Sequence, residues 1–378
     1  MEGDILKIKK KYIIIPTAIL LIFTSILLSF NKVASAIIPK LIEINVSSLT
    51  PEQNKTLDSL KKVDNHPLYV MDYYGDYSQF LKLKEKYYWF LGIPKPKCST
   101  FAITDQNGDS LFGRNNDNAD CPVMLLFTHP KDGYDSVSVV SISGLGFDTG
   151  NKSPLESKKI STRLLYTPFF SSDGMNEWGL AIGDMSVPGS KVSIDPDKDT
   201  MFDGEMKRYI LDHAKNTDEA IEILSRYNVS FSGLPQHYLI SDPSGNSAVI
   251  EWVDGQMQIT KNKAHEIAAT NFMCYGSEDI IKKCENEYAA TGKIQDDING
   301  KSYWRYITIM KELRKDYDTE ITTDKAMHLL STVSFPKGNN MYYPTQWSVV
   351  YDMNSGEINI AMGRNYDNKH GFKLEMQK

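Results

Sequence analysis

The sequence predicts an α+β fold in which antiparallel sheets pack against layers of helices. Segments with strand hairpin patterns follow one another, pairs of amphipathic helices come after them, and hairpins return near the carboxyl end. Such segregated runs differ from the regular strand–helix alternation that builds a parallel sheet. The chain also shows no internal repeat of fixed period and no low-complexity tract.

Composition describes an ordered globular chain whose charge does not favour nucleic acid. Hydrophobic residues make up 41% of the 378 residues, and the formal net charge is −6 at pH 7. An acidic surface opposes non-specific binding to nucleic acid, and the sequence contains no basic stripe. We therefore exclude nucleic acid as a partner.

The first 36 residues have the features of an export signal. Residues 7–11 contain four lysines, residues 12–30 are almost wholly apolar, and Ala34-Ser35-Ala36 is a small-residue cleavage site. We expect a secreted or extracytoplasmic protein, and the lysine- and isoleucine-rich start indicates a bacterial source. Because the apolar run is nearly long enough to span a bilayer, an uncleaved membrane anchor through residues 12–30 is the alternative.

Residues 37–97 form a segment that we interpret as a prosegment. Thr50 is a suitable N-cap for a helix, and an aromatic-rich stretch follows. The segment ends in Gly92-Ile93-Pro94-Lys95-Pro96-Lys97, where two prolines favour turn and extended chain. Such an approach leaves the Lys97 carbonyl accessible to attack by the next residue. The alternative is a helical cap that stays attached.

A hairpin that brings reactive groups together begins at Cys98. Asn107-Gly108 lies between two apolar runs, and this dipeptide is the strongest short-range hairpin signal. A turn centred between these two residues would place Cys98 opposite Asp117, with Arg114 on the same strand as Asp117. The pattern therefore predicts that a thiol, a carboxylate and a guanidinium converge.

The rest of the chain is predicted from its periodicity and its turn signals. Strands are expected at 137–143, 180–185, 237–241, 248–253, 256–260, 348–352 and 357–362. Helices are expected at 203–215, 217–227, 302–315 and 323–332, with Thr217 as the N-cap of the second.

The hairpin suits a nucleophile whose general base is its own α-amine. If the Lys97–Cys98 bond is cut, Cys98 becomes the first residue, and a free α-amine with a pKa of about 7.7 to 8.0 can accept the thiol proton. The charge of Arg114 would favour the thiolate. Asp117 would hold the amine in place.

The four cysteines leave a disulfide interpretation open. Cys274 and Cys284 lie close enough in sequence to pair, with Cys121 left over if Cys98 is catalytic. A Cys98–Cys121 bridge would instead block the nucleophile. No Cys-x-x-Cys motif is present, so the sequence does not indicate a zinc ribbon or a thioredoxin-like site.

Several runs of residues, in order along the chain, carry a family resemblance. They are Cys98, the run Phe112-Gly113-Arg114-Asn115 with Asp117, the run 173–180 that contains Asp-Gly-Met-Asn-Glu, Ala269-Thr270-Asn271, and Tyr303-Trp304-Arg305-Tyr306. These runs resemble the choloylglycine hydrolase and linear amide C–N hydrolase family. Its members are N-terminal nucleophile hydrolases related to penicillin V acylases.

The resemblance implies a four-layer αββα sandwich over residues 98–378 that cleaves linear, non-peptide amides without a metal or organic cofactor. It also implies Asn271 as an oxyanion donor and Arg305 as a second active-site arginine. Bile salt hydrolases carry an asparagine where this chain has Ser186, so only a backbone N–H near Ser186 is expected to reach the oxyanion. This departure makes bile salts a less suitable substrate than other amides.

These observations predict an exported amidohydrolase that activates itself by cleavage before Cys98. Its substrate is expected to be a small N-acyl amide, cleaved through a thioester. Acyl transfer to an amine and a non-catalytic surface binding protein are the two alternatives, and the sequence leaves a homo-oligomer open. His237 is interpreted as a structural strand histidine, since no papain-like signature accompanies it.

Overall fold

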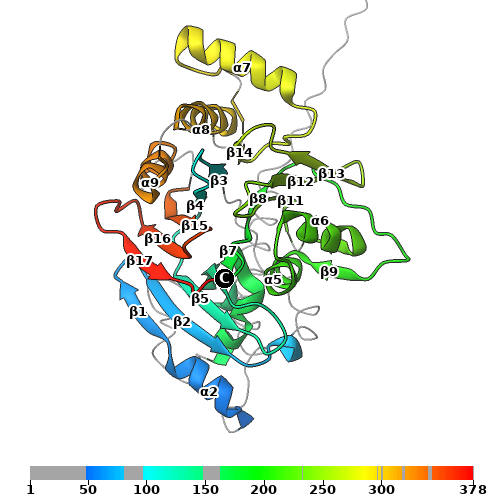
Figure 1. Ribbon diagram of the computed structural model, residues 1–378, viewed down its shortest axis with the longest axis vertical. Helices are drawn as coiled ribbons and strands as arrows, with labels where there is room; N and C mark the ends of the chain where they lie inside the picture. Colours follow the sequence, from blue (N-terminus) through cyan, green and yellow to red (C-terminus); the bar gives the residue numbers. More distant parts are fainter. Residues whose placement is uncertain are drawn as a thin grey trace, which may run out of the picture.

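The computed structural model describes residues 48–80, 97–147, 162–231, 233–295, 297–298, 301–316, 320–338 and 343–377. The expected signal peptide or anchor lies outside these ranges, as do residues 37–47 and 81–96 of the expected prosegment. No helix within the described ranges combines the length and the apolar character that a membrane crossing requires. Two large sheets face each other, and helices cover their outer faces (Figure 1).

The first sheet has nine strands, in the order β1-β2-β5-β6-β7-β8-β11-β12-β13. Its neighbouring strands are antiparallel except for β2 and β5, which run parallel. The strands are β1 (Lys61–Asp64), β2 (Leu68–Tyr74), β5 (Val123–His129), β6 (Ser136–Ser141), β7 (Ser171–Asn176), β8 (Ala181–Ser186), β11 (Gln236–Ser241), β12 (Ser247–Val253) and β13 (Gln256–Lys261).

The second sheet has six antiparallel strands, in the order β14-β3-β4-β15-β16-β17. They are β3 (Lys97–Thr104), β4 (Ser110–Asp117), β14 (Glu266–Ala269), β15 (Thr345–Asp352), β16 (Glu357–Met362) and β17 (His370–Lys373). A small parallel pair, β9 (Thr200–Phe202) and β10 (Asn228–Ser230), lies apart from both sheets.

Apolar side chains alternate along the strands and pack on both faces of the two sheets. Leu125 and Leu239 from the first sheet meet Phe112 and Trp347 from the second in the centre of the sandwich. The outer face of the first sheet packs on α5 (Asp203–His213) and α6 (Thr217–Arg226), and that of the second on α8 (Ser302–Asp316) and α9 (Thr323–Thr332). This arrangement confirms the expected αββα layers.

The remaining helices are short or peripheral. The helix α7 (Glu278–Thr291) packs beside α8, and α2 (Pro51–Asp58) packs beside β2 (Figure 1). Short 3-10 helices cover Ser78–Phe80, Ile142–Leu145 and Thr162–Phe170. Thr50 caps α2 as predicted, since its side chain accepts a hydrogen bond from Gln53 N.

The described part of the segment before Cys98 belongs to the core of the fold. Strand β2 pairs with β5 over seven residues, from Leu68 opposite Val123 to Tyr74 opposite His129. Tyr73 is fully buried and donates its hydroxyl to Leu165 O at 3.0 Å, while Tyr77 donates to Asp212 Oδ2 at 2.6 Å. This segment therefore adds two strands and a helix to the sandwich.

The structure corrects the predicted register of the Cys98 hairpin by one residue. Cys98 lies opposite Asn116, and Lys97 lies opposite Asp117. The connection is a five-residue loop because the Asp105 carboxylate accepts from the backbone N–H of Asn107 at 2.8 Å and of Asp109 at 3.1 Å. As a result, the Asp117 side chain lies on the opposite face of the strand pair from the thiol.

Two further expectations are settled by local geometry. Asn216 rather than Thr217 caps α6, since its side chain accepts from Glu219 N at 2.9 Å. All four cysteines are free, so neither Cys274–Cys284 nor Cys98–Cys121 forms a disulfide in this structure.

Candidate active site

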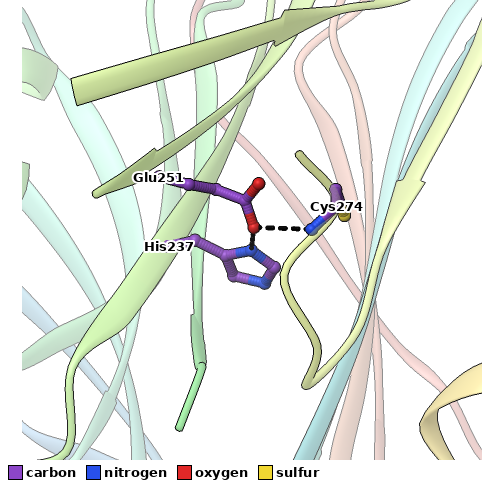
Figure 2. A group of neighbouring side chains, drawn as sticks. All are labelled: His237, Glu251 and Cys274. Atoms are coloured by element: carbon purple, nitrogen blue, oxygen red, sulfur yellow. Dashed lines mark hydrogen bonds and ion pairs between the residues drawn. The ribbon is translucent and has the colours of Figure 1, made fainter. Parts of the chain in front are cut away.

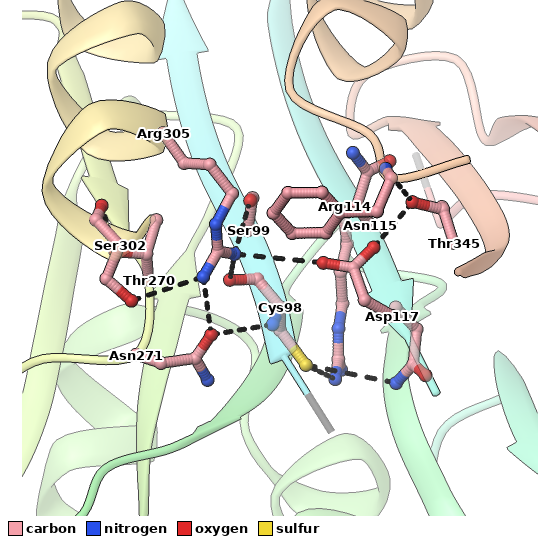
Figure 3. Close-up of polar contacts among 12 residues, drawn as sticks. Cys98, Ser99, Arg114, Asn115, Asp117, Thr270, Asn271, Ser302, Arg305 and Thr345 are labelled. Carbon is pink, nitrogen blue, oxygen red and sulfur yellow. Dashed lines mark hydrogen bonds and ion pairs between the residues drawn. The ribbon is translucent and has the colours of Figure 1, made fainter. Parts of the chain in front are cut away.

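Cys98 lies at the start of β3, inside the sandwich, where its side chain is only 1% exposed. Its sulfur accepts a hydrogen bond from Arg114 Nη2 at 3.4 Å (Figure 3). Asn116 Nδ2 lies 3.9 Å from the same sulfur. Arg114 and Asn116 lie two residues apart on β4, so both side chains point to the face that holds the thiol.

Asn271 holds the main-chain nitrogen of Cys98. Cys98 N donates to Asn271 Oδ1 at 2.9 Å, and the same oxygen accepts from Arg305 Nη2 at 2.8 Å (Figure 3). Asn271 Nδ2 donates to Ser186 O at 2.9 Å. Because two donors meet one atom of the amide and an acceptor meets the other, the orientation of the Asn271 side chain is fixed. Ser186 thus contacts the site through its carbonyl.

Arg305 links these groups to the second face of β3. It comes from the first turn of α8 and is fully buried. Its Nη1 donates to Cys98 O and, at 2.9 Å, to Ser99 Oγ. The same nitrogen lies 3.9 Å from Asp117 Oδ2. Arg305 therefore fixes the backbone around the nucleophile rather than contacting the sulfur.

Asp117 takes a different place from the one that the sequence predicts. Its carboxylate accepts from Thr345 Oγ1 at 2.5 Å and faces Arg305, whereas Asn271 is the partner of the Cys98 nitrogen (Figure 3). The shifted register explains this, since Asp117 points toward α8. Burial raises the pKa of Asp117 to about 6, although Arg305 and Thr345 favour the ionised form.

Arg114 is surrounded by buried acids that were not among the predicted site residues. Its Nη2 lies 2.9 Å from Asp184 Oδ1, and its Nη1 lies 3.4 Å from Asp173 Oδ2. Lys207 from α5 pairs with Asp184 in turn. Burial opposes ionisation of Asp184, but Lys207 and Arg114 outweigh it and lower its pKa. The sequence does hold one signal, because Asp184 is a charged residue within an otherwise apolar strand.

The environment of Cys98 favours the thiol over the thiolate. Burial raises the pKa of the Cys98 thiol above its usual value, and the charge of Arg114 offsets this only in part. A nucleophilic attack at neutral pH therefore requires a nearby group that accepts the proton. The nitrogen of Cys98 itself is the base that the sequence predicts for this role.

A second buried polar cluster contacts Thr270 and consists of His237, Glu251 and Cys274 (Figure 2). The potential ligand atoms of these three residues lie within 4.8 Å of one another. However, His237 Nδ1 is only 2.7 Å from Glu251 Oε1, which is a hydrogen-bond distance. Two ligands of one tetrahedral zinc ion would be about 3.3 Å apart. The cluster therefore has the geometry of a hydrogen-bonded pair rather than of a metal centre.

Comparison with known proteins identifies the family. A family model described as acyl-coenzyme A:6-aminopenicillanic acid acyl-transferase matches residues 166–367, more than half of the chain. The chain belongs to this family. The matched range includes Asn271 and Arg305 and begins after Cys98, Arg114 and Asp117. No curated protein sequence matches the chain.

Solved structures with the same fold include a bile acid hydrolase and a penicillin V acylase. A mutant of the conjugated bile acid hydrolase from Clostridium perfringens has 16% sequence identity and a TM-score of 0.52, over 74% of this chain and 93% of that chain. Penicillin V acylase from Agrobacterium tumefaciens has 16% identity and a TM-score of 0.53, over 73% of this chain and 86% of that chain. These matches confirm the fold expected from the sequence.

Proposed function

We propose that this protein is a cysteine N-terminal nucleophile hydrolase that cleaves a linear, non-peptide amide of an N-acyl substrate. One observation carries the proposal: Asn271 holds the nitrogen of Cys98 at 2.9 Å while Arg114 lies 3.4 Å from the sulfur of the same residue. The two solved neighbours, named as a bile acid hydrolase and a penicillin V acylase, support amide cleavage as the reaction class.

Activation requires cleavage of the Lys97–Cys98 bond. The Cys98 thiol attacks the Lys97 carbonyl, the acyl group moves from nitrogen to sulfur, and water hydrolyses the resulting thioester. This sequence leaves a carboxylate on Lys97 and a free α-amine on Cys98. Asn271 Oδ1, already bonded to that nitrogen, then orients the amine. We further propose export through residues 1–36, before or together with this step.

Turnover uses the same two atoms of Cys98. The amine takes the thiol proton, the sulfur attacks the substrate acyl carbon, and the amine returns the proton to the departing nitrogen. Asn116 and Asn271, whose side-chain amides flank the sulfur and the nitrogen, stabilise the negative oxygen of the tetrahedral intermediate. Water, deprotonated by the amine, hydrolyses the thioester and releases the acid.

Acyl transfer to an amine is the second candidate, and the description of the matched family favours it. It shares every step up to the thioester and differs only in the group that attacks it. Product analysis with a competing amine separates the two reactions. A product that contains the added amine supports transfer, and free acid alone supports hydrolysis.

The experiment that tests the proposal combines mass and activity. We expect the purified protein to contain a chain that begins at Cys98, and a panel of N-acyl amides to release free amine. Cys98→Ala should abolish both processing and turnover, while Cys121→Ser, a second buried cysteine, should retain both. Full activity of the Cys98→Ala protein, or an active protein with an intact Lys97–Cys98 bond, would refute the mechanism.

A further inference from the structure

A buried histidine–glutamate pair ties the Asn271 loop to the nine-stranded sheet. His237 on β11 and Glu251 on β12 lie one residue beyond the Tyr238–Ile250 pair, and both side chains are fully buried. The loop that follows β14 carries Thr270 and Asn271. His237 Nε2 lies 2.7 Å from Thr270 O, and Glu251 accepts from Cys274 N at 2.8 Å. Figure 2 shows Glu251 between His237 and Cys274.

The contacts determine where the protons of His237 lie. A carbonyl oxygen only accepts hydrogen bonds, so Nε2 carries a hydrogen toward Thr270 O. Glu251 Oε1 lies 2.7 Å from Nδ1, and an ionised carboxylate also only accepts. Burial opposes ionisation of Glu251, but the hydrogen bond and charge of His237, with two backbone N–H groups, lower its pKa. Each ring nitrogen of His237 thus faces one oxygen atom, Thr270 O at Nε2 and Glu251 Oε1 at Nδ1.

The hydrogen bond from His237 acts next to the residue that holds the nucleophile. Thr270 O belongs to the peptide unit that joins Thr270 to Asn271, so fixing this oxygen fixes the plane from which the Asn271 side chain projects. Thr270 Oγ1 donates to Ser302 O of α8 at 2.9 Å, which holds the same residue from the other side. Asn271 Oδ1 then meets Cys98 N at 2.9 Å.

We propose that His237 and Glu251 are positioning residues that hold the Thr270–Asn271 peptide so that Asn271 Oδ1 orients the Cys98 nitrogen. In its effect on turnover this inference rests on the proposed function. Neither residue touches the nucleophile. They act through Thr270, and Glu251 additionally fixes the far end of the loop at Cys274 and Tyr275.

Two substitutions of one histidine provide a matched test. In His237→Gln the side-chain Nε2 takes the place of the imidazole Nε2 and keeps a donor for Thr270 O. In His237→Asn the side-chain Nδ2 takes the place of Nδ1, keeps a donor for Glu251 and loses the one for Thr270. Each variant removes the imidazole ring and one of its two hydrogen bonds. His370→Asn, in the His370–Asp64 pair at 2.6 Å between β17 and β1, controls for loss of a histidine elsewhere.

The measurements are the kcat and KM of amide hydrolysis, and the rate at which iodoacetamide alkylates Cys98 at pH 7. For His237→Asn we expect kcat and the alkylation rate to fall about tenfold, as for one lost hydrogen bond, with little change in KM. His237→Gln and His370→Asn should stay within about threefold of the wild type. Equal losses in both His237 variants, or no loss in either, would overturn the inference.

A second variant tests Glu251 and remains informative if His237→Asn does not fold. Glu251→Gln keeps the size of the side chain and one acceptor oxygen but removes the charge that holds His237. We expect alkylation of Cys98 to slow, and a wild-type rate would overturn the role of Glu251. The alkylation assay needs no substrate. Slower alkylation in a protein that hydrolyses no N-acyl amide would therefore reject the proposed function and retain this inference.

Discussion

Arg305 and Asp117 face each other on the helix side of β3 and β4, with Nη1 3.9 Å from Oδ2, while the thiol of Cys98 points to the opposite side of the same strands. The carboxylate thus balances the arginine that holds the Cys98 backbone. Asn271, rather than Asp117, holds the Cys98 nitrogen. The site therefore has two layers of charge, one on each face of the hairpin.

The buried position of Asp117 predicts how stability changes with pH. Its pKa of about 6 in the folded protein exceeds the ordinary value of 3.8, so the folded state keeps a proton that the unfolded chain has already released between these pH values. The stabilisation that this group provides is fully present below about pH 4. It is lost as the pH rises through 6, and the free energy of unfolding falls by about 3 kcal/mol at most.

Asp117→Asn should remove this dependence, because asparagine does not titrate. Urea unfolding of wild type and variant between pH 4 and pH 7 measures the effect. We expect the difference in unfolding free energy between the two proteins to change over that interval. A constant difference would mean that Asp117 is ionised throughout.

Asn271 provides a prediction about catalysis. Asn271→Leu removes both the acceptor for Cys98 N and the donor to Ser186 O. The substitution also removes the side-chain amide that we propose as an oxyanion donor. Because loss of one such donor lowers kcat by about 10² to 10³, we expect a decrease of that size with slow processing. Asn262→Leu, on the surface loop after β13, is the matched control. Normal kcat for Asn271→Leu in processed enzyme would contradict the assigned role.

Lys207 provides a prediction about thiol reactivity. It neutralises Asp184, whose negative charge raises the pKa of the Cys98 thiol. In Lys207→Met we expect the pH at which Cys98 alkylation is half-maximal to move upward. Because buried Asp184 loses one of its two cationic partners and keeps Arg114, we expect a loss of stability of at most about 3 to 5 kcal/mol. The double variant Lys207→Met with Asp184→Asn should recover much of the lost stability and much of the shift in the alkylation pH. Lys215→Met, an exposed lysine over the Trp178 ring, should change neither.

The segment before Cys98 provides a prediction about the processed protein. Because β2 pairs with β5 inside the sheet and Tyr73 is fully buried, the piece that contains residues 48–80 should stay bound after cleavage at Lys97. Denaturing electrophoresis should show two chains that elute together under native conditions. Cys98→Ala should show one chain. Loss of the smaller piece from active enzyme in native buffer would disprove this.

Periodicity and turn signals predicted many of the strands and helices, because these signals are local, whereas the four layers were expected from the family resemblance. The prediction failed at the Cys98 hairpin, where the Asp105 side chain builds a longer loop than Asn107-Gly108 alone indicates. It also gave no partner for the segment before Cys98, because the parallel pairing of β2 with β5 joins residues far apart in the chain. Lys207 and Asp184 meet only after α5 packs on β8, so their pairing has no sequence signature.

The parallel contact between β2 and β5 has a practical consequence for how this enzyme can be produced. A shortened chain that starts at Cys98 would have a free α-amine on the nucleophile. However, it would lack β2, so β5 would become an exposed edge strand with unpaired backbone N–H and C=O groups. Such an edge attracts strands from other molecules and leads to insoluble material. Residues 48–80 therefore protect the edge of β5, and a recombinant chain should include them.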